Sequence, residues 1–426
     1  MTTRYFVIDL ETSVKNRGEF AIGKQSGSPH APDNKIVLYG SLELVDYSAP
    51  SRLSIASDDT VARQDWVDEV LGKADYLIGQ NIKFDCMYLL YHHHDEFMHF
   101  VKRGGQIYDT QLAEYILTGQ EDKMIPLSSK YTLDKKGTKV MTREGLSVRY
   151  GGTDKDDRIA AFWNDGYETE DIPHTMLRDY LEDDLRNTAM IFIDQIDKLH
   201  AAGQYLLFAS CCDQLLLTTI MEYNGMFFSL DQAFEDVVPL EKELTNLEEE
   251  TRLFLFEHFS IFCYDDARFP LEPHHINPNS VQQLHTFIWG GSFNYTVDEP
   301  QFDDNGVPII YKSGLKKGKQ KTKKALKAVT VNSTLGNLAD MPKTQNTSNG
   351  TITEIIDSTW ITTKQAEFLR TVLKMRHLSK DINTYYLGLT SLTWPHDNCI
   401  HGSFIHTNTA TGRLSSAAPN LQNITN

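Results

Sequence analysis

Short runs of β-branched and aromatic residues alternate with helix-like stretches in the first half of the chain. The runs predict strands at 5–10, 35–44 and 76–79, and the stretches between them predict helices at 66–73, 84–92 and 110–117. Strands that alternate with helices are typical of an α/β domain with a mixed sheet. We therefore expect an α/β domain over residues 1–205.

The pattern becomes mainly helical after this domain. Between about residues 209 and 262 the pattern is helical, over 212–223 and then 230–259. The Glu and Lys residues interspersed in the second stretch predict charged outer faces and an arm-like bundle. Residues 311–350 are polar and rich in Gly, Lys, Thr and Asn, which predicts a mobile insertion or loop. The chain closes on a segment rich in Gly, Ser and Asn, residues 401–426.

Composition narrows the class of protein. A length of 426 residues allows two or three domains, and 40% hydrophobic residues predict a globular chain. The net charge of −17 argues against a generally basic surface, so local basic patches or metal ions would have to hold any nucleic acid. The five cysteines show no CxxC pairing, which indicates neither a disulfide framework nor a cysteine zinc site. With no membrane-length apolar stretch and no signal-peptide pattern, a cytoplasmic protein without a membrane contact is expected.

Carboxylates occur in three short segments where a soluble domain has no structural use for them. Asp9 and Glu11 are two residues apart on a predicted strand, so both side chains lie on one face. Asp85 lies in the first turn of a predicted helix, where the helix dipole favours a negative charge. Taken singly, these residues could also be an ordinary strand end and an ordinary helix start.

Asp184 is harder to explain by structure alone. A helix predicted from Pro173 to about Leu199 places Asp184 in the middle of its apolar stripe, one turn after Tyr180. A buried carboxylate bonded to the Tyr180 hydroxyl is the simpler alternative, but it leaves the other two segments unexplained. Because carboxylates that converge in a protein interior nearly always hold cations, the sequence predicts a metal-dependent phosphodiesterase.

The segments Asp9–Glu11, Asn81–Asp85 and Tyr180–Asp184 resemble the motifs of the DEDD exonuclease superfamily, in the subclass that has tyrosine in the third motif (DEDDy). The resemblance implies an RNase H-like fold and two metal ions held by the four carboxylates. Mg²⁺ suits an all-oxygen site, and Mn²⁺ can substitute for it.

The resemblance also assigns roles to three further residues. It implies that Tyr180 orients the attacking water, and that Asn81 and Lys83 lie near the scissile phosphate. A helix cap and a solvated lysine are the simpler interpretations of the last two. The expected product is a nucleoside monophosphate released from a 3′ end.

The final residues, 409–416 and 419–423, closely resemble the segment that enters the palm of family A DNA polymerases. This resemblance implies that Arg413 contacts the primer terminus, and that polar neighbours face the minor groove of primer-template DNA, which is read without sequence preference. These neighbours are Ser415, Asn420, Gln422 and Asn423. A loop with a solvated arginine is the simpler alternative.

Residues 221–225 and 277–280 resemble thumb motifs of the same family. Together the motifs imply a phage-type family A DNA polymerase whose exonuclease domain spans 1–205. A mainly helical thumb would span 206–400, with an insertion at about 310–357, and the start of the palm would span 401–426.

The family's later palm and fingers motifs are not in this sequence, which ends at Asn426. We therefore expect that the chain does not polymerise DNA by itself, and that a second polypeptide supplies palm and fingers. An interrupted gene product and a truncated chain are alternatives. The expected partners are a single-stranded DNA 3′ end and primer-template DNA, and a processivity factor is a further candidate. The expected location is the host cytoplasm if the gene is carried by a phage.

Eight lysines between Asp304 and Asp340 could follow the phosphates of DNA, although a solubilising loop is an equal alternative. They are Lys312, Lys316, Lys317, Lys319, Lys321, Lys323, Lys324 and Lys327. Two other functions stay open. One is an RNase D-like exoribonuclease, and the other is a catalytically inactive DNA-binding fragment.

Overall fold

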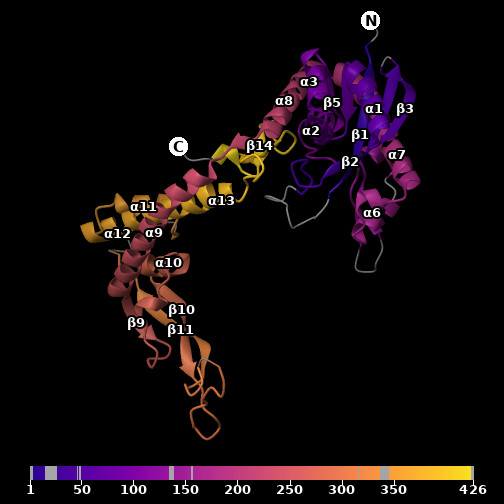
Figure 1. Cartoon of the computed structure of the whole chain (residues 1–426). Coiled ribbons are helices and arrows are strands. Elements are labelled where there is room, and N and C mark those ends of the chain that lie inside the picture. Colours follow the sequence, from indigo (N-terminus) through magenta and orange to yellow (C-terminus); the bar gives the residue numbers. More distant parts are fainter. Residues whose placement is uncertain are drawn as a thin grey trace. The chain divides into compact units, whose positions relative to one another are not determined.

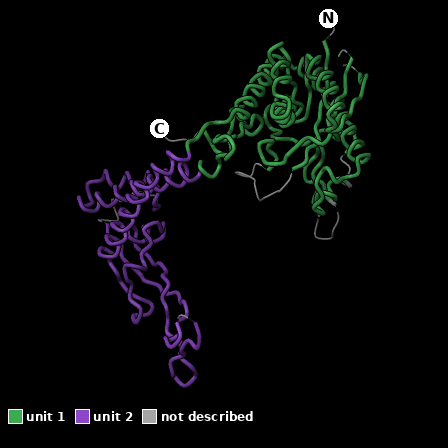
Figure 2. Tube along the Cα trace, viewed as in Figure 1, with its two compact units in different colours: residues 1–229, 389–426 green, residues 230–388 purple. Residues whose placement is uncertain are grey.

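The chain divides into two compact units in its computed structural model (Figures 1 and 2). The first unit contains residues 1–229 and 389–426, and the second contains residues 230–388. The structure describes residues 3–14, 26–45, 47, 49–133, 139–154, 157–314, 316–335 and 345–423. The first unit is discontinuous in sequence, because the last part of the chain returns to it.

A mixed five-stranded sheet forms the centre of the first unit. Its strand order is β3-β2-β1-β4-β5, and the strands are β1 (Tyr5–Ser13), β2 (Lys35–Val45), β3 (Ala49–Ser57), β4 (Tyr76–Gly79) and β5 (Gln106–Asp109). Strands β1, β2 and β3 pair antiparallel, whereas β1, β4 and β5 pair parallel. The predicted α/β domain with a mixed sheet is confirmed, and the three predicted strands are β1, β2 and β4.

Eight helices of this unit, together with one hairpin, accompany the sheet among the described residues. They are α1 (Thr60–Lys73), α2 (Lys83–His92), α3 (His94–Lys102), α4 (Thr110–Leu117), α5 (Leu146–Arg149), α6 (Asp157–Asn164), α7 (His174–Ala201) and α8 (Tyr205–Asn224), with the hairpin β6 (Lys130–Leu133) and β7 (Lys139–Arg143). Helix α7 is the helix predicted after Pro173. Its buried side recurs at Leu177, Leu181, Asp184 and Thr188, as the 3.6-residue period requires.

The last part of the chain is bound to the first unit by strand pairing and hydrogen bonds. Strand β12 (Cys399–Ile400) pairs with β8 (Met226–Phe227), and β13 (Ser403–Ile405) pairs with β14 (Ser415–Ala417). The hydroxyl of Tyr115 on α4 donates to the carbonyl of Thr409. The short helix α13 (Leu387–Thr390) precedes these C-terminal strands, and a 3-10 turn (Leu421–Asn423) follows them.

The second unit has its own hydrophobic core, built from helices and a three-stranded antiparallel sheet. The helices are α9 (Leu230–His258), α10 (Val281–Trp289), α11 (Asn349–Ile356) and α12 (Thr363–Lys380), and the sheet order is β10 (Gly291–Pro300), β11 (Thr322–Asn332), β9 (Ser260–Tyr264). The Ser280 side chain accepts from the backbone N–H of Gln283 and caps α10. No described helix of the chain is long and apolar enough to cross a membrane.

The prediction of a mobile insertion or loop at 311–350 is wrong for strand β11, which lies inside it. Strand β11 pairs with β10 from Thr322 to Val331 and with β9 from Val329 to Asn332. The lysines of this segment hid a period-two pattern in which Val329 and Val331 are buried. Lys327 is not a free phosphate-binding lysine, because its Nζ lies 2.9 Å from Asp266. Residues 315 and 336–344 of the predicted insertion lie outside the described residues.

Asp109 joins the starts of two helices beside the sheet. Its carboxylate accepts from the N–H groups of Gln111 and Leu112, at 2.8 and 3.0 Å, and from Ile82 N–H at 3.0 Å. Burial of the side chain raises the pKa of Asp109 to about 6, against the opposing effect of these hydrogen bonds. Asp109 therefore fixes the entry to α2, the helix that carries Asp85.

Asp109 should make the stability of the first unit depend on pH. An unfolded aspartate titrates near pH 3.9, so Asp109 binds its proton more tightly in the folded state. Protonation of Asp109 therefore contributes up to about 3 kcal/mol to the free energy of unfolding, and this contribution is lost as the pH rises from 4 through 6. Asp109→Asn should remove this slope in urea unfolding measured from pH 4 to 7.5. The asparagine amide should also lower the free energy of unfolding by an amount that does not depend on pH, because it places an N–H donor against the N–H of Ile82. Parallel curves for wild type and variant would contradict the assignment.

Candidate active site

The structure brings the predicted carboxylates into one cavity of about 290 Å³. Central strand β1 supplies Asp9 and Glu11, the first turn of α2 supplies Asp85, and the buried side of α7 supplies Tyr180 and Asp184. Residues as far apart in sequence as Asp9 and Asp184 therefore share one site.

The carboxylates are close enough to bind a common cation. One carboxylate oxygen from each of Asp9, Glu11 and Asp184 lies within 4.8 Å of the other two. Glu11 and Asp184 are only 7% and 6% exposed. Asp85 is oriented toward the same strand, because its Oδ1 accepts from the backbone N–H of Leu10 at 3.0 Å.

The electrostatics of the site favour cations of charge two. Burial, followed by the neighbouring charge of Asp9 and then that of Glu11, raises the pKa of Asp85 well above its ordinary value. Clustered buried carboxylates cannot all ionise cheaply without a compensating positive charge. The donor set consists of oxygens, which are the ligands that Mg²⁺ prefers, so the residues present fit that ion.

Tyr180 is placed beside Asp184 by the helix geometry. It lies one turn earlier on α7, is buried, and lines the same cavity. The ring of Trp163 from α6 meets the Tyr180 ring edge-on, with centroids 6.2 Å apart. The tyrosine ring is thus packed against Trp163 in the cavity that the carboxylates line.

Asn81 also lines the carboxylate cavity, in the turn between β4 and α2, with a φ of 56°. The simpler interpretation of Asn81 as a helix cap is wrong, because Ile82 occupies the N-cap position of α2 and no side chain caps this helix. An asparagine tolerates this left-handed backbone better than most residues.

Lys83 takes a different position from the one predicted. Its ammonium pairs with Glu222 of α8 and donates to the carbonyl of Phe404, and its side chain is 13% exposed. The interpretation as a solvated lysine is wrong, since the Lys83 side chain is largely shielded from solvent and paired with Glu222. It lines a second cavity of about 310 Å³ with Glu222 and His401, and it does not line the described carboxylate cavity.

The residues predicted to contact primer-template DNA gather around the β13–β14 hairpin, and none that is described lines the carboxylate cavity. Arg413 is exposed before β14, and Ser415 begins that strand, with its hydroxyl 3.2 Å from Asn408 Nδ2. The Asn420 side chain accepts from Gln422 N–H at 3.2 Å. Asn423 ends the 3-10 turn, and its side chain lies outside the described part of the chain.

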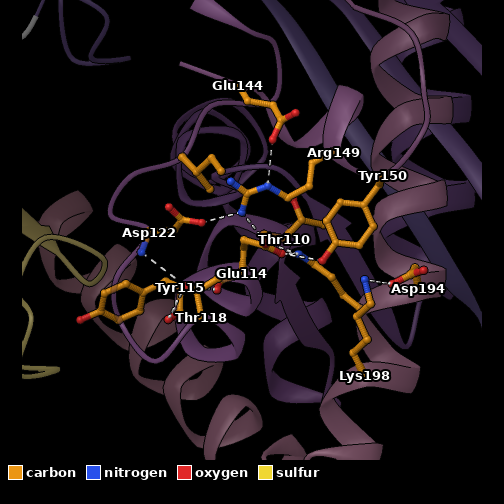
Figure 3. Close-up of polar contacts among 12 residues, drawn as sticks. Thr110, Glu114, Tyr115, Thr118, Asp122, Glu144, Arg149, Tyr150, Asp194 and Lys198 are labelled. Carbon is orange, nitrogen blue, oxygen red and sulfur yellow. Dashed lines mark hydrogen bonds and ion pairs between the residues drawn. The ribbon is translucent and has the colours of Figure 1, made fainter. Parts of the chain in front are cut away.

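Sequence reasoning missed a polar network around the buried carboxylate of Glu114 (Figure 3). Glu114 on α4 accepts from Arg149 Nη1 at 2.8 Å, from the Tyr150 hydroxyl at 2.6 Å and from Gln195 Nε2 at 3.0 Å. These bonds join α4 and α5 to α7, the helix that carries Asp184. The signal was present, because Glu114 is a charged residue among the apolar residues of α4, as Asp184 is on α7.

The chain has relatives among DNA polymerases. Residues 313–426 match the family model described as DNA polymerase family A. The chain is 26% identical to DNA polymerase I of Synechocystis sp. over 366 residues, which is 85% of this chain and 28% of that protein. It is 55% identical to DNA polymerase I of Helicobacter pylori over 53 residues, 12% of this chain and 6% of that protein.

One solved structure also aligns with the chain, with a TM-score of 0.48 and 15% identity. It is the POL domain of Pol1 from M. smegmatis in complex with DNA primer-template and dNTP, and the alignment covers 100% of this chain and 52% of that chain. The chain spans well under a third of the length of the curated relatives it matches. The family A resemblance of the C-terminal residues is confirmed by the family model. The chain is therefore related to the family A DNA polymerases, through residues 313–426 and through its similarity to DNA polymerase I proteins.

Proposed function

We propose that the first unit is a 3′-to-5′ exonuclease that removes nucleotides from a DNA primer end, within a phage-type family A DNA polymerase. The observation that carries the proposal is the convergence of Asp9, Glu11, Asp85 and Asp184 in one cavity. We also infer an RNase H-like fold for this unit. The mixed sheet, with two of the carboxylates on its central strand, supports that inference.

The site residues would hold two Mg²⁺ ions, for which Mn²⁺ can substitute. Bound there, the ions supply electrostatic stabilisation of the attacking and leaving oxygens of a phosphodiester. The four carboxylates contribute ligand oxygens from β1, α2 and α7, so the arrangement is rigid before substrate arrives. Tyr180, whose ring packs edge-on against Trp163, would orient the attacking water with its hydroxyl. The oxygen of that water joins the phosphorus, and a proton from it ends on the leaving 3′ oxygen as the nucleoside monophosphate departs.

The segment around the β13–β14 hairpin is proposed to contact primer-template DNA. Arg413 would meet the primer terminus, and the polar side chains of Ser415, Asn420 and Gln422 would face the minor groove. The match of residues 313–426 to the family supports this role. DNA synthesis itself is proposed as an activity of the complete polymerase, whose palm and fingers a second polypeptide would supply.

The exonuclease proposal is tested with the purified chain, Mg²⁺ and a 5′-labelled single-stranded DNA. The expected result is shortening by one nucleotide at a time with release of deoxynucleoside monophosphate, which stops when EDTA is added. An RNA of the same sequence serves as the comparison. Faster shortening of the RNA would favour an RNase D-like exoribonuclease, and DNA binding in a gel-shift assay without any cleavage would favour an inactive DNA-binding fragment.

A further inference from the structure

A second cluster of metal-ligating side chains lies in the first unit, apart from the carboxylate cavity. One ligand atom from each of His30, Asp397 and His401 lies within 4.8 Å of the other two. His30 belongs to the segment before β2, whereas Asp397 and His401 flank β12. The cluster thus joins the N-terminal part of the unit to the part of the chain that returns to it.

The hydrogen bonds of His401 define its protonation. Its Nδ1 lies 2.8 Å from the backbone carbonyl of Glu222, which can only accept, so Nδ1 carries the proton. In the neutral ring Nε2 then presents a lone pair to the Asp397 carboxylate, 2.9 Å away. Two acceptors at this distance repel each other unless a positive charge, either a proton on Nε2 or a bound cation, lies between them. A histidine that donates one ring N–H to a backbone carbonyl is the usual arrangement of a metal-ligating histidine.

His30 supplies an independent observation. It is 7% exposed, and among the described residues neither of its ring nitrogens has a hydrogen-bond partner. Leaving such a group unsatisfied costs about 1–3 kcal/mol, so each case in a folded protein calls for an explanation. One ring nitrogen of His30 lies within 4.8 Å of ligand atoms of His401 and Asp397. The His30 ring stacks on the His401 ring with centroids 3.6 Å apart, so the His30 ring must turn about its side-chain bonds before both imidazoles can bind one ion.

We propose that His30, Asp397 and His401 form a binding site for one Zn²⁺ ion. Two imidazole nitrogens with one carboxylate oxygen are a donor set typical of zinc and unlike the all-oxygen set that Mg²⁺ prefers. His396, whose Nε2 lies 3.4 Å from the same Asp397 oxygen, is the nearest further donor. The bound ion fastens the returning segment, which leads to the β13–β14 hairpin, onto the N-terminal segment and the end of α8.

The test uses the full chain with Asp9→Ala and Glu11→Ala, so that the carboxylate cavity does not compete for the metal. The metal-free protein is titrated with Zn²⁺ in competition with a chromophoric chelator. One tightly bound ion per chain is expected, and His30→Ala or Asp397→Asn should weaken its binding by at least about tenfold. His99→Ala removes an exposed histidine of α3 and is the matched control, which should bind zinc like the parent.

Thermal unfolding followed by circular dichroism separates loss of the site from loss of the fold. Zn²⁺ should raise the unfolding temperature of the parent and of His99→Ala, but not that of His30→Ala or Asp397→Asn. Asp397 is partly exposed and asparagine keeps its shape, so this variant is expected to fold even if His30→Ala does not. The proposal is overturned if the parent binds no zinc in competition with the chelator, or if Asp397→Asn binds it as tightly as the parent.

Discussion

Alanine at both Asp9 and Glu11 should lower nucleotide release from single-stranded DNA by about a thousandfold or more. Metal ions held at such sites contribute several kcal/mol to stabilising the charge of the transition state, and each 1.36 kcal/mol changes the rate tenfold. The measurement is single-turnover release of the 3′-terminal nucleotide with enzyme in excess over DNA and with saturating Mg²⁺. Because three of the carboxylates have oxygens within 4.8 Å of one another, losing two of them leaves no complete ligand set.

The matched control is Glu182→Ala with Asp183→Ala, which removes two carboxylates from the outer side of α7, next to Asp184. This variant should keep the wild-type rate. In EDTA the Asp9→Ala, Glu11→Ala protein should be at least as stable as wild type, since it relieves repulsion among buried carboxylates. Retention of activity without Asp9 and Glu11 would remove the basis for the proposed exonuclease.

Replacing Glu222 with alanine should lower the free energy of unfolding of the first unit by about 3–5 kcal/mol. The substitution leaves the buried ammonium of Lys83 without its partner, and the backbone N–H of Phe404 loses its acceptor. Urea unfolding should be followed by tryptophan fluorescence in a Trp289→Phe, Trp360→Phe background, so that only tryptophans of the first unit report.

Two comparisons show whether burial of the ion pair is the cause. Lys83→Met combined with Glu222→Leu replaces both charges by apolar groups and should recover most of the lost stability. Asp194→Ala breaks the half-exposed pair with Lys198 on α7 and should cost less than about 1 kcal/mol. An effect of Glu222→Ala no larger than that of Asp194→Ala would contradict the buried pair.

The sequence predicted those parts of the site that depend on local periodicity. The period of two placed Asp9 and Glu11 together on β1, and the period of 3.6 placed Asp184 on the buried side of α7 beside Tyr180. A carboxylate within an apolar stripe is informative because burying it alone is costly. The convergence of three segments could therefore be predicted before their distances were known.

Contacts between distant residues could not be predicted in this way. Lys83 has the sequence context of a solvated lysine, and its partner Glu222 is 139 residues away. His30 gives no signal in its local sequence, because the rings that it contacts, among them Tyr91, Tyr223 and His401, are all distant in sequence. Strand β11 was missed for a different reason, since its lysines outweighed the alternation of valines in composition.

The discontinuity of the first unit sets an order of events during synthesis. Strand β8 pairs with β12, and the N–H of Phe228 donates to the carbonyl of Asn398 at 2.9 Å. Both interactions therefore form only after the much later residues of β12 have been translated. At about 5–20 residues per second, β8 waits roughly ten to thirty seconds for its partner. All strands of the second unit are complete before β12 emerges. The second unit can therefore fold on the ribosome as an insertion, while the first still exposes the surface that its last strands will cover.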